Sequence, residues 1–470
     1  MWDFQRFAEN VVAVSEDAGY MTYHELIEEN EKLANAIKSR CLVFVLCSNK
    51  IGALIGYTTC ITHGMVPLLL AGDINQELLV NLIDTYKPDY LWIPDLDKKK
   101  FAEYPVVFGT HGYLLIATGY KTVYPINEEL CLLLTTSGST GSPKLVRQSY
   151  KNVFSNAEAI AEYLELDAAE RPITTLPMNY TYGLSIINSH LLVGASIIFT
   201  EKSLMQKEFW TYFRATKATS FGGVPYTYEM LDKLRFTKMD LPFLRTMTQA
   251  GGKLQPELHK KLAEYAMKNQ KKLYVMYGQA EATARMSYLP YEKTLEKYGS
   301  MGIAIPGGKF SIIDLEGNPV KTPNTTGELV YEGPNVTLGY AESGGDLIKG
   351  DERFGRLITG DMAQVDEDGY YYIVGRKKRF LKIFGNRVNL DEVDRLIKAR
   401  FENIECVSSG IDDKMYLFVT DGTYNNEIRR YISEITGLNP SAFTVKTLDS
   451  IPRNDSGKTK YTELEKYYDI

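Results

Sequence analysis

A short segment that joins an apolar run to a glycine-rich loop constrains this chain more than any other feature. Residues 130–134 are apolar, and the loop Thr135-Thr-Ser-Gly-Ser-Thr-Gly-Ser-Pro-Lys144 follows them directly. A helix-like pattern then begins at Ser149. A strand, a tight loop and a helix in this order are typical of α/β folds that hold an anion at the end of a strand. A flexible serine and glycine linker, which is the alternative, would not need an apolar strand before it.

The loop carries the chemical groups that bind phosphate. Its glycines let the backbone turn tightly and approach a bulky anion, its hydroxyls donate hydrogen bonds, and its lysine adds a positive charge. The spacing is not that of the Walker loop, because Pro143 stands where that loop has glycine. The candidate phosphate-binding residues are Thr136, Ser137, Gly138, Ser139, Thr140, Gly141 and Lys144.

Helix-like and strand-like segments alternate over the first part of the chain, which predicts parallel strands with crossover helices. Residues 173–176 are among the predicted strands. Later runs are short and separated by Gly, Asp and Asn, and the end of the chain has an α+β pattern. The predicted fold class is therefore α/β. We expect a large N-terminal domain of α/β sheets with a small β-barrel-like part, residues 1–377, and a small mobile α+β domain, residues 378–470.

Length and charge agree with a large enzyme. A chain of 470 residues exceeds what one hydrophobic core supports. The net charge of −6 argues against nucleic acid or an anionic membrane as partner. No uncharged apolar run reaches the ~18 residues of a membrane span, and the N-terminus has no signal-peptide pattern. The 5 cysteines lack C-x-x-C pairing, so we expect them to be reduced and buried, in a cytoplasmic protein.

Two further segments, residues 277–281 and 359–361, suit a nucleotide. Tyr277, Gly278 and Gln279 follow a predicted strand, and an aromatic ring there can stack on a base. Glu281 can hold Mg²⁺ among phosphate oxygens. Asp361 follows a tight turn and can accept hydrogen bonds from ribose hydroxyls. A plain turn explains each segment taken alone, so the segments carry weight only in combination.

In order and spacing, these segments resemble the adenylate-forming (AMP-binding) superfamily of acyl-CoA synthetases, aryl-CoA ligases, luciferases and peptide-synthetase adenylation domains. The resemblance covers essentially the whole chain. Its segments include Thr136-Ser-Gly-Ser-Thr-Gly-Ser-Pro-Lys144, Gln249-Ala-Gly-Gly-Lys-Leu254, Tyr277-Gly-Gln-Ala-Glu281, Gly339-Tyr340, Thr359-Gly-Asp361, Gly375-Arg376 and Gly457-Lys458.

The resemblance implies that ATP and a carboxylic acid react to form an acyl-adenylate, which then acylates a pantetheine thiol. Lys458 and Glu281 are the implied catalytic residues, with Glu281 also the Mg²⁺ ligand. Asp361 and Arg376 are expected to bind the ribose, and Tyr277 the adenine. Lys378 is the expected hinge of the mobile domain, and Gly385 is expected to let the pantetheine arm pass.

The sequence departs from the family pattern at positions 280 and 180, and at the latter Tyr180 stands where acyl-CoA synthetases often have histidine. Ala280 stands where the family usually has threonine, which removes one hydroxyl contact; Thr283 is a candidate replacement. No aspartate lies between Met178 and His190, which disfavours an α-amino acid, because burying its ammonium unpaired is costly. The implied lining is apolar or aromatic: Tyr180, Tyr182, Val224, Tyr226 and Gly252.

The thiol acceptor stays open between CoA and the phosphopantetheine of an acyl-carrier protein. Arg379 and Lys382 are candidates for binding the 3′-phosphate of CoA. Alternative functions are a peptide-synthetase-type amino-acid adenylating enzyme, a nucleotide-binding homologue without turnover and, more remotely, a luciferase-like oxygenase. Catalysis rather than binding alone is favoured by the retention of four residues: Lys144, Glu281, Asp361 and Lys458.

Overall fold

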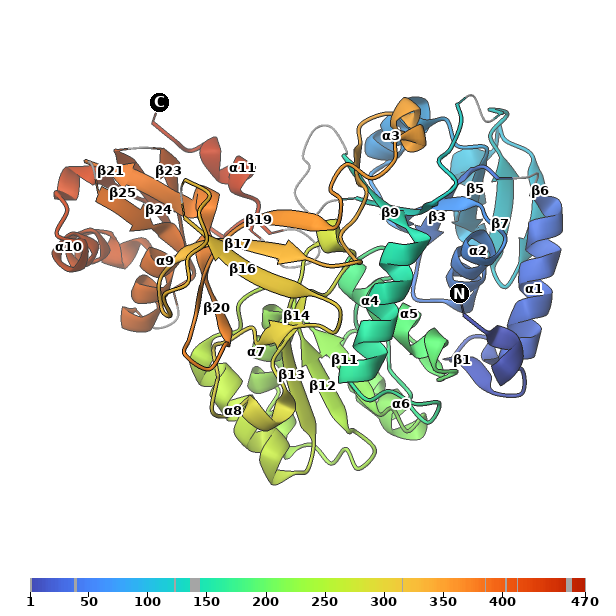
Figure 1. Ribbon diagram of the computed structural model, residues 1–470, viewed down its shortest axis with the longest axis horizontal. Coiled ribbons are helices and arrows are strands. Elements are labelled where there is room, and N and C mark those ends of the chain that lie inside the picture. The colour runs from blue at the N-terminus through green and yellow to red at the C-terminus, as the bar shows by residue number, and fades with distance from the viewer. Residues whose placement is uncertain are drawn as a thin grey trace. The chain divides into compact units, whose positions relative to one another are not determined.

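The structure is a computed structural model that describes residues 2–37, 40–121, 124–135, 144–314, 316–384, 386–401, 404–411, 413–453 and 459–469. It consists of two compact units, Met1–Phe310 with Tyr331–Leu357, and Ser311–Val330 with Ile358–Ile470. Figure 1 labels the elements of each. The second unit includes strands that precede residue 378, and the domain boundary drawn there from the sequence stays a prediction.

The largest sheet of the first unit has parallel strands at its centre (Figure 1). In spatial order its strands are β18 (Gly339–Ala341), β9 (Leu145–Ser149), β8 (Leu130–Thr135), β4 (Val66–Ala71), β3 (Leu42–Cys47), β5 (Tyr90–Pro94), β7 (Tyr113–Ala117) and β6 (Val106–Thr110). Strand β3 pairs in parallel with β4 and β5, and β4 with β8. The predicted α/β fold is thereby confirmed, whereas the antiparallel strands at both edges were not predicted.

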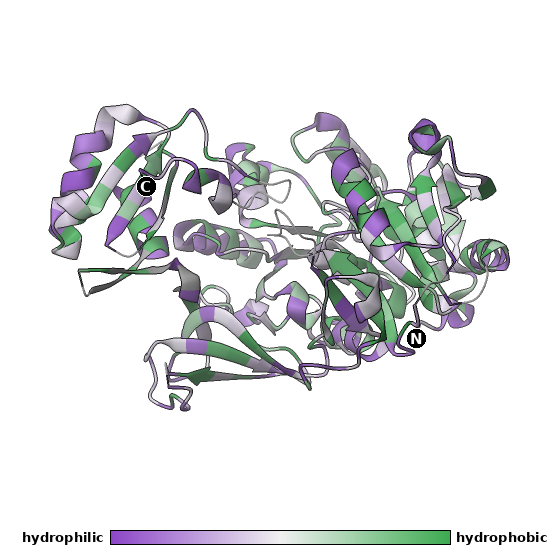
Figure 2. Ribbon diagram, turned by 90° about the horizontal axis from the view of Figure 1, so that it is seen from above, coloured by the Kyte–Doolittle hydropathy of each residue, from purple (hydrophilic) through white to green (hydrophobic). Residues whose placement is uncertain are grey.

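Capping residues fix where two helices of this unit begin. Thr22 forms a capping box with Glu25 before α1 (Tyr23–Ala36), and Ser149 forms one with Asn152 before α4 (Tyr150–Tyr163). The other helices are α2 (Ile51–Thr62), α3 (Gln76–Tyr86), α5 (Thr181–Leu192), α6 (Lys207–Ala215), α7 (Pro225–Lys233) and α8 (Pro256–Lys268). In Figure 2 many helices alternate between hydrophilic and hydrophobic residues while sheet strands are largely hydrophobic, as expected for helices that cover a sheet.

A second sheet of this unit leads to the candidate site. Its strands, in spatial order, are β11 (Ser220–Gly223), β12 (Thr246–Gln249), β13 (Lys272–Tyr277), β14 (Ser287–Tyr288) and β15 (Ile303–Ala304). The first three are parallel and the last two turn back antiparallel. A smaller sheet has the order β10 (Ile197–Phe199), β1 (Val11–Ser15) and β2 (Gly19–Thr22).

The prediction of a strand at residues 173–176 is wrong. Only isolated bridges form there, from Pro172 to Ser220 and from Ile173 to Ile198. Pro172 has no N–H with which to extend a ladder. Beyond Ile173, the hydroxyl of Thr175 donates to the carbonyl of Gly222 at 2.5 Å, so a side chain takes the place of a backbone partner.

The second unit combines a β-sheet with an α+β tail. The sheet has the order β16 (Lys309–Ile313), β17 (Gly327–Glu332), β19 (Arg356–Val365) and β20 (Tyr371–Arg376). The tail holds β21 (Phe380–Ile383) paired with β22 (Asn386–Asn389), and β23 (Cys406–Ile411), β24 (Lys414–Val419) and β25 (Phe443–Thr447). Its helices are α9 (Leu390–Arg400), α10 (Asn425–Thr436) and α11 (Tyr461–Glu465). The α+β pattern predicted for the end of the chain is confirmed.

Two expectations drawn from composition can be compared with the structure. All five cysteines are buried and free, and burial raises the pKa of the Cys47 thiol well above its ordinary value. They are therefore packing residues, as predicted. Among the described helices, none has the length and apolarity that crossing a bilayer requires.

Candidate active site

Several of the predicted site residues cannot be located. The following lie outside the described residues: Thr136, Ser137, Gly138, Ser139, Thr140, Gly141, Gly385 and Lys458. The side chain of Lys378 is likewise not described. The roles proposed for all of these stay predictions.

The segment after β13 brings three predicted residues together. Strand β13 ends at Tyr277, and Met286 donates its N–H to the carbonyl of Tyr277 at 2.8 Å as the chain returns towards β14. The short 3-10 helix η4 (Ala280–Ala282) carries Glu281. Gln279 Nε2 donates to Tyr277 Oη at 3.1 Å. The aromatic ring, the amide and the carboxylate thus follow the carboxyl end of a parallel strand, where ligands bind in open α/β sheets.

The carboxylate of Glu281 is held by a tyrosine from a distant part of the sequence. Tyr340 Oη donates to Glu281 Oε1 at 2.7 Å. Burial and, next, the negative charge of Glu281 raise the pKa of Tyr340 to about 12, so the phenol stays a hydrogen-bond donor at neutral pH. The backbone carbonyl of Glu281 accepts from Thr337 Oγ1 at 2.9 Å and from Arg353 Nη1 at 3.0 Å. The carboxylate therefore has a fixed position.

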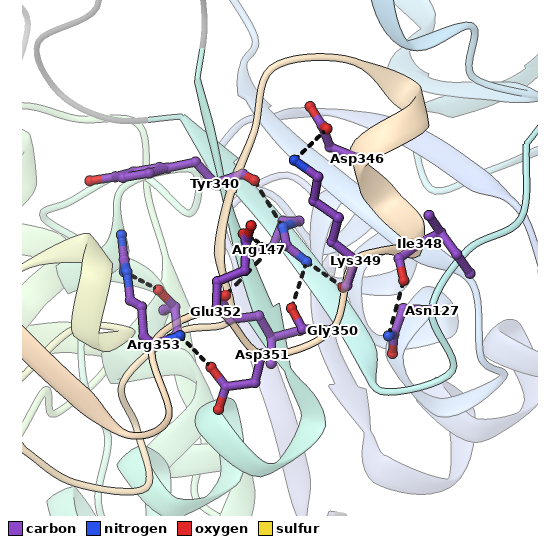
Figure 3. Close-up of polar contacts among 12 residues, drawn as sticks. Asn127, Arg147, Tyr340, Asp346, Ile348, Lys349, Gly350, Asp351, Glu352 and Arg353 are labelled. Atoms are coloured by element: carbon purple, nitrogen blue, oxygen red, sulfur yellow. Dashed lines mark hydrogen bonds and ion pairs between the residues drawn. The ribbon is translucent and has the colours of Figure 1, made fainter.

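A buried arginine orders the segment that carries Tyr340 (Figure 3). The Arg147 side chain is fully buried and forms an ion pair with Glu352. It also donates to the carbonyls of Tyr340 at 3.0 Å and Gly350 at 3.2 Å. Arg353 lies over the ring of Tyr340, 4.6 Å from its centroid. Because one guanidinium binds several carbonyls of this segment, it fixes the chain on both sides of Tyr340.

The environment of Glu281 fits a magnesium ion bound together with nucleotide phosphates. Glu281 is partly exposed, and its Oε2 atom has no hydrogen-bond partner among the described residues. Within the same residues, no cluster of three or more His, Cys, Asp or Glu side chains is placed to hold a metal. Mg²⁺ typically takes one or two carboxylates and completes its shell with phosphates and water. A single oriented carboxylate is the donor set that such an ion needs.

Lys144 precedes the strand that pairs with the strand of Tyr340. Leu145 of β9 pairs with Ala341 of β18, and Tyr340 of β18 holds Glu281. Lys144 Nζ pairs with Glu342 Oε1 at 2.6 Å, and both side chains are more than half exposed. An exposed pair of this kind is worth at most about 1 kcal/mol, so another anion can readily replace Glu342 as the partner of Lys144.

We predict that Tyr340→Phe lowers the rate of ATP-dependent acid activation about 5- to 20-fold and raises the Mg²⁺ concentration needed for half-maximal rate, because Glu281 loses one hydrogen bond. The assay is acid-dependent ATP–pyrophosphate exchange across a Mg²⁺ titration. The matched control is Tyr86→Phe, which removes a phenol that donates to Ala341 of the same strand at 2.9 Å without touching Glu281. Identical Mg²⁺ curves for wild type and Tyr340→Phe would contradict the role given to Tyr340.

Part of the predicted acid pocket is brought together. Tyr182 and Val224 are buried in one apolar cluster, against which Tyr180 packs. The rings of Tyr180 and Tyr182 lie edge to face, 6.4 Å apart. A Cβ added at Gly251 would lie 2.5 Å from Tyr180 Oη and 3.1 Å from Val224 Cγ1. Gly251 therefore faces this group, although the sequence had pointed to its neighbour Gly252.

The other two predicted lining residues have different surroundings. The nearest side chain to Gly252 is Pro225, at 3.1 Å from an added Cβ. Tyr226 is 51% exposed. The pair of glycines in the sequence signalled the turn, but only the left-handed backbone of Gly251, with φ of +83°, identifies which glycine is required there.

Thr283 does not replace the hydroxyl that is missing at Ala280. Its side chain is buried, and Thr283 Oγ1 donates to the carbonyl of Asn335 at 2.7 Å. Its proton is therefore engaged within the protein, and the expectation that Thr283 compensates is wrong.

In the second unit, the predicted ribose-binding residues are direct neighbours. Asp361 of β19 pairs in register with Arg376 of β20, and Arg376 Nε lies 2.8 Å from Asp361 Oδ1. The Asp361 side chain is buried whereas that of Arg376 is largely exposed. The pairing orients both groups together.

Arg379 does not suit the 3′-phosphate of CoA. Its guanidinium is buried and pairs with Asp391 Oδ1 at 2.8 Å and with Asp394 Oδ2 at 2.7 Å. Two carboxylates already compensate its charge, so the sequence-based suggestion for Arg379 is wrong, whereas the side chain of Lys382 is not described.

Comparisons with known proteins identify the family. Residues 2–341 match the family described as AMP-binding enzyme. A probable CoA ligase of Humulus lupulus is 28% identical over 62% of this chain and 55% of its own length. An oxalate–CoA ligase of Arabidopsis thaliana is 29% identical over 70% of this chain and 66% of its own length. The chain thus spans less than two thirds of the length of these curated relatives.

A solved structure agrees over nearly the whole chain. The o-succinylbenzoate CoA synthetase of Bacillus subtilis, in complex with its acyl-adenylate intermediate, superposes with a TM-score of 0.80 and 21% identity. The match covers 98% of this chain and 97% of the other. At this identity the likeness establishes the fold, and the family match establishes membership. This chain belongs to the AMP-binding enzyme family.

Proposed function

We propose that this chain is an ATP-dependent acid–thiol ligase, which activates a carboxylic acid as its acyl-adenylate and transfers the acyl group to CoA or to the phosphopantetheine of an acyl-carrier protein. The main support is Glu281, a carboxylate oriented by Tyr340 with one oxygen left for a ligand, beside the strand that follows Lys144. The relatives above are named as CoA ligases, which supports CoA as the thiol. The proposed compartment is the cytoplasm.

The proposed reaction has two steps. An acid carboxylate is a poor acyl donor, because its oxygen is a poor leaving group. Its oxygen attacks the α-phosphorus of ATP, and the bond to the β-phosphate oxygen breaks to release pyrophosphate. The thiol sulfur then attacks the acyl carbon, the thiol proton leaves, and the bond to AMP breaks. Positioning and charge neutralisation supply most of the rate enhancement in such phosphoryl chemistry.

Each predicted site residue has a role in this reaction. Lys144 and the loop before it hold the leaving phosphates, and Tyr277, Gly278 and Gln279 hold the adenine. Glu281 binds Mg²⁺, which neutralises phosphate charge when present. The ribose is bound by Asp361 and Arg376. The catalytic lysine is Lys458, and the hinge is Lys378. Gly385 lets the pantetheine arm pass.

Exchange of labelled pyrophosphate into ATP tests the proposal. A panel of aliphatic, aromatic, dicarboxylic and amino acids is assayed, and we expect exchange that depends on the acid and on Mg²⁺. ATP binding without exchange for any acid would favour the nucleotide-binding homologue instead. Exchange confined to amino acids would favour the peptide-synthetase type.

A further inference from the structure

A buried arginine next to the predicted acid pocket has no anionic partner among the residues that the structure describes. Arg285 is 2% exposed. Its Nε donates to Ser185 Oγ at 3.0 Å and its Nη1 to Tyr163 Oη at 3.0 Å. Nη1 also lies 3.4 Å from Met276 Sδ, and among the described residues Nη2 has no hydrogen bond and the guanidinium forms no ion pair with a carboxylate. Buried cations are normally paired, because removing a charge from water is costly.

The groups around Arg285 are neutral. Burial raises the pKa of Tyr163 and of Tyr182 above the ordinary value of a phenol, so neither supplies a negative charge. Burial also lowers the pKa of His190 to about 4, with Arg285 contributing to that shift, so the imidazole is uncharged near neutral pH. In the part of the chain that the structure describes, Arg285 thus has the face of the Tyr182 ring beside it but no negatively charged partner, whereas the buried Arg147 and Arg379 each have carboxylate partners.

Arg285 borders the acid pocket directly. Its guanidinium lies 5.2 Å from the centroid of the Tyr182 ring. Tyr182 contacts Tyr180 and donates through Oη to Thr248 Oγ1 at 2.7 Å. Arg285 also follows the Tyr277–Glu281 segment in the chain, on the return towards β14. The guanidinium therefore lies at the wall that Tyr182, a predicted acid-binding residue, forms.

We propose that Arg285 binds a second carboxylate of the acid, so that the substrate class is a dicarboxylic acid with one carboxylate activated and the other held at this wall. The inference rests on the proposed function. The planar guanidinium offers two parallel donors that match a carboxylate, and the substrate would supply the missing negative charge. The same charge repels the ammonium of an amino acid, which agrees with the absence of an aspartate between Met178 and His190.

The test compares each diacid with its own monomethyl ester, over a series of chain lengths, in the pyrophosphate-exchange assay. Wild type should prefer the diacid by about 100-fold or more in kcat/KM, because a site built for a polar group discriminates strongly against its loss. Arg285→Met keeps the length and apolar stem of the side chain and should bring that ratio close to one, whereas Arg285→Lys should keep part of it. The ratio is measured on one enzyme at a time, so a general loss of stability does not move it.

A matched control and a binding measurement complete the design. Arg245→Met removes an exposed arginine that pairs with Glu170 at 3.6 Å, and it should leave the ratio unchanged. Diacids should raise the melting temperature of wild type but not of Arg285→Met, and this readout requires no turnover. Equal use of diacid and monoester by wild type would overturn the inference even if Arg285→Met does not fold. If no acid supports exchange, a shift of the melting temperature that is specific to diacids would support the Arg285 site and contradict the proposed ligase function. If neither exchange nor such a shift is observed, both proposals are rejected.

Discussion

Lys458→Ala is expected to slow acid-dependent ATP–pyrophosphate exchange by roughly 10³-fold or more, because the variant loses the cation that bridges the acid carboxylate and the α-phosphate as charge develops. Thioester formation from supplied acyl-adenylate and thiol should be spared, since that step needs no charge neutralisation at phosphorus. Single-turnover measurements of both half-reactions, made on one preparation, separate the two effects.

The chain around Lys458 offers a control. Arg453 and Thr459, on the two sides of the segment that carries Lys458, pair with each other as an isolated antiparallel bridge. Lys460 is next to this bridge and forms an exposed ion pair with Glu463 at 3.3 Å. Lys460→Ala removes a positive charge at nearly the same place and should leave both half-reactions close to wild type. Exchange by Lys458→Ala at the wild-type rate would refute the assignment of the catalytic lysine.

Elements specified by local patterns could be predicted from the sequence. The apolar run before the loop is β8, and the helix expected from Ser149 begins where that serine caps it. Capping, apolar periodicity and turn residues act over a few positions, so a single sequence contains them. The antiparallel strand β9 between loop and helix was missed, because five residues after a loop show no clear alternation.

The contacts that hold Glu281 and Tyr340 in place could not be predicted, because they join residues that are distant in the sequence. Arg147 and Glu352 are far apart in the sequence and read as ordinary surface charges, yet the arginine side chain is completely buried. The Gly339-Tyr340 motif suggests no role for Tyr340, and only the β9–β18 pairing and the hydrogen bond to Glu281 reveal its role. Arg285 gave one signal, a lone charge within an otherwise apolar or small run, but its lack of a carboxylate partner among the described residues is a property of the fold.

Gly278→Ala is expected to lower pyrophosphate exchange roughly 100-fold or more, because even a shift of about 1 Å in a site can cost that much. An added Cβ would lie 1.7 Å from the carbonyl oxygen of Ala284 and 2.9 Å from Arg285 Cα. Both neighbours are backbone atoms, so relief requires the returning chain to move away from β13. We expect the free energy of unfolding to fall by about 1–3 kcal/mol, as for other overpacked positions. Chemical denaturation and the exchange assay measure the two effects separately.

Gly278→Ala should reduce activity more than it reduces stability, because the displaced backbone belongs to the segment that positions Glu281 and Arg285. Gly345→Ala is the matched control: its added Cβ would meet only Ser343 Oγ, at 3.7 Å, which is an ordinary contact. That variant should keep both stability and exchange. If Gly278→Ala kept wild-type exchange, the close approach of residue 278 to residue 284 would be irrelevant to catalysis, and the assignment of the Tyr277–Glu281 segment to the nucleotide site would lose its structural basis.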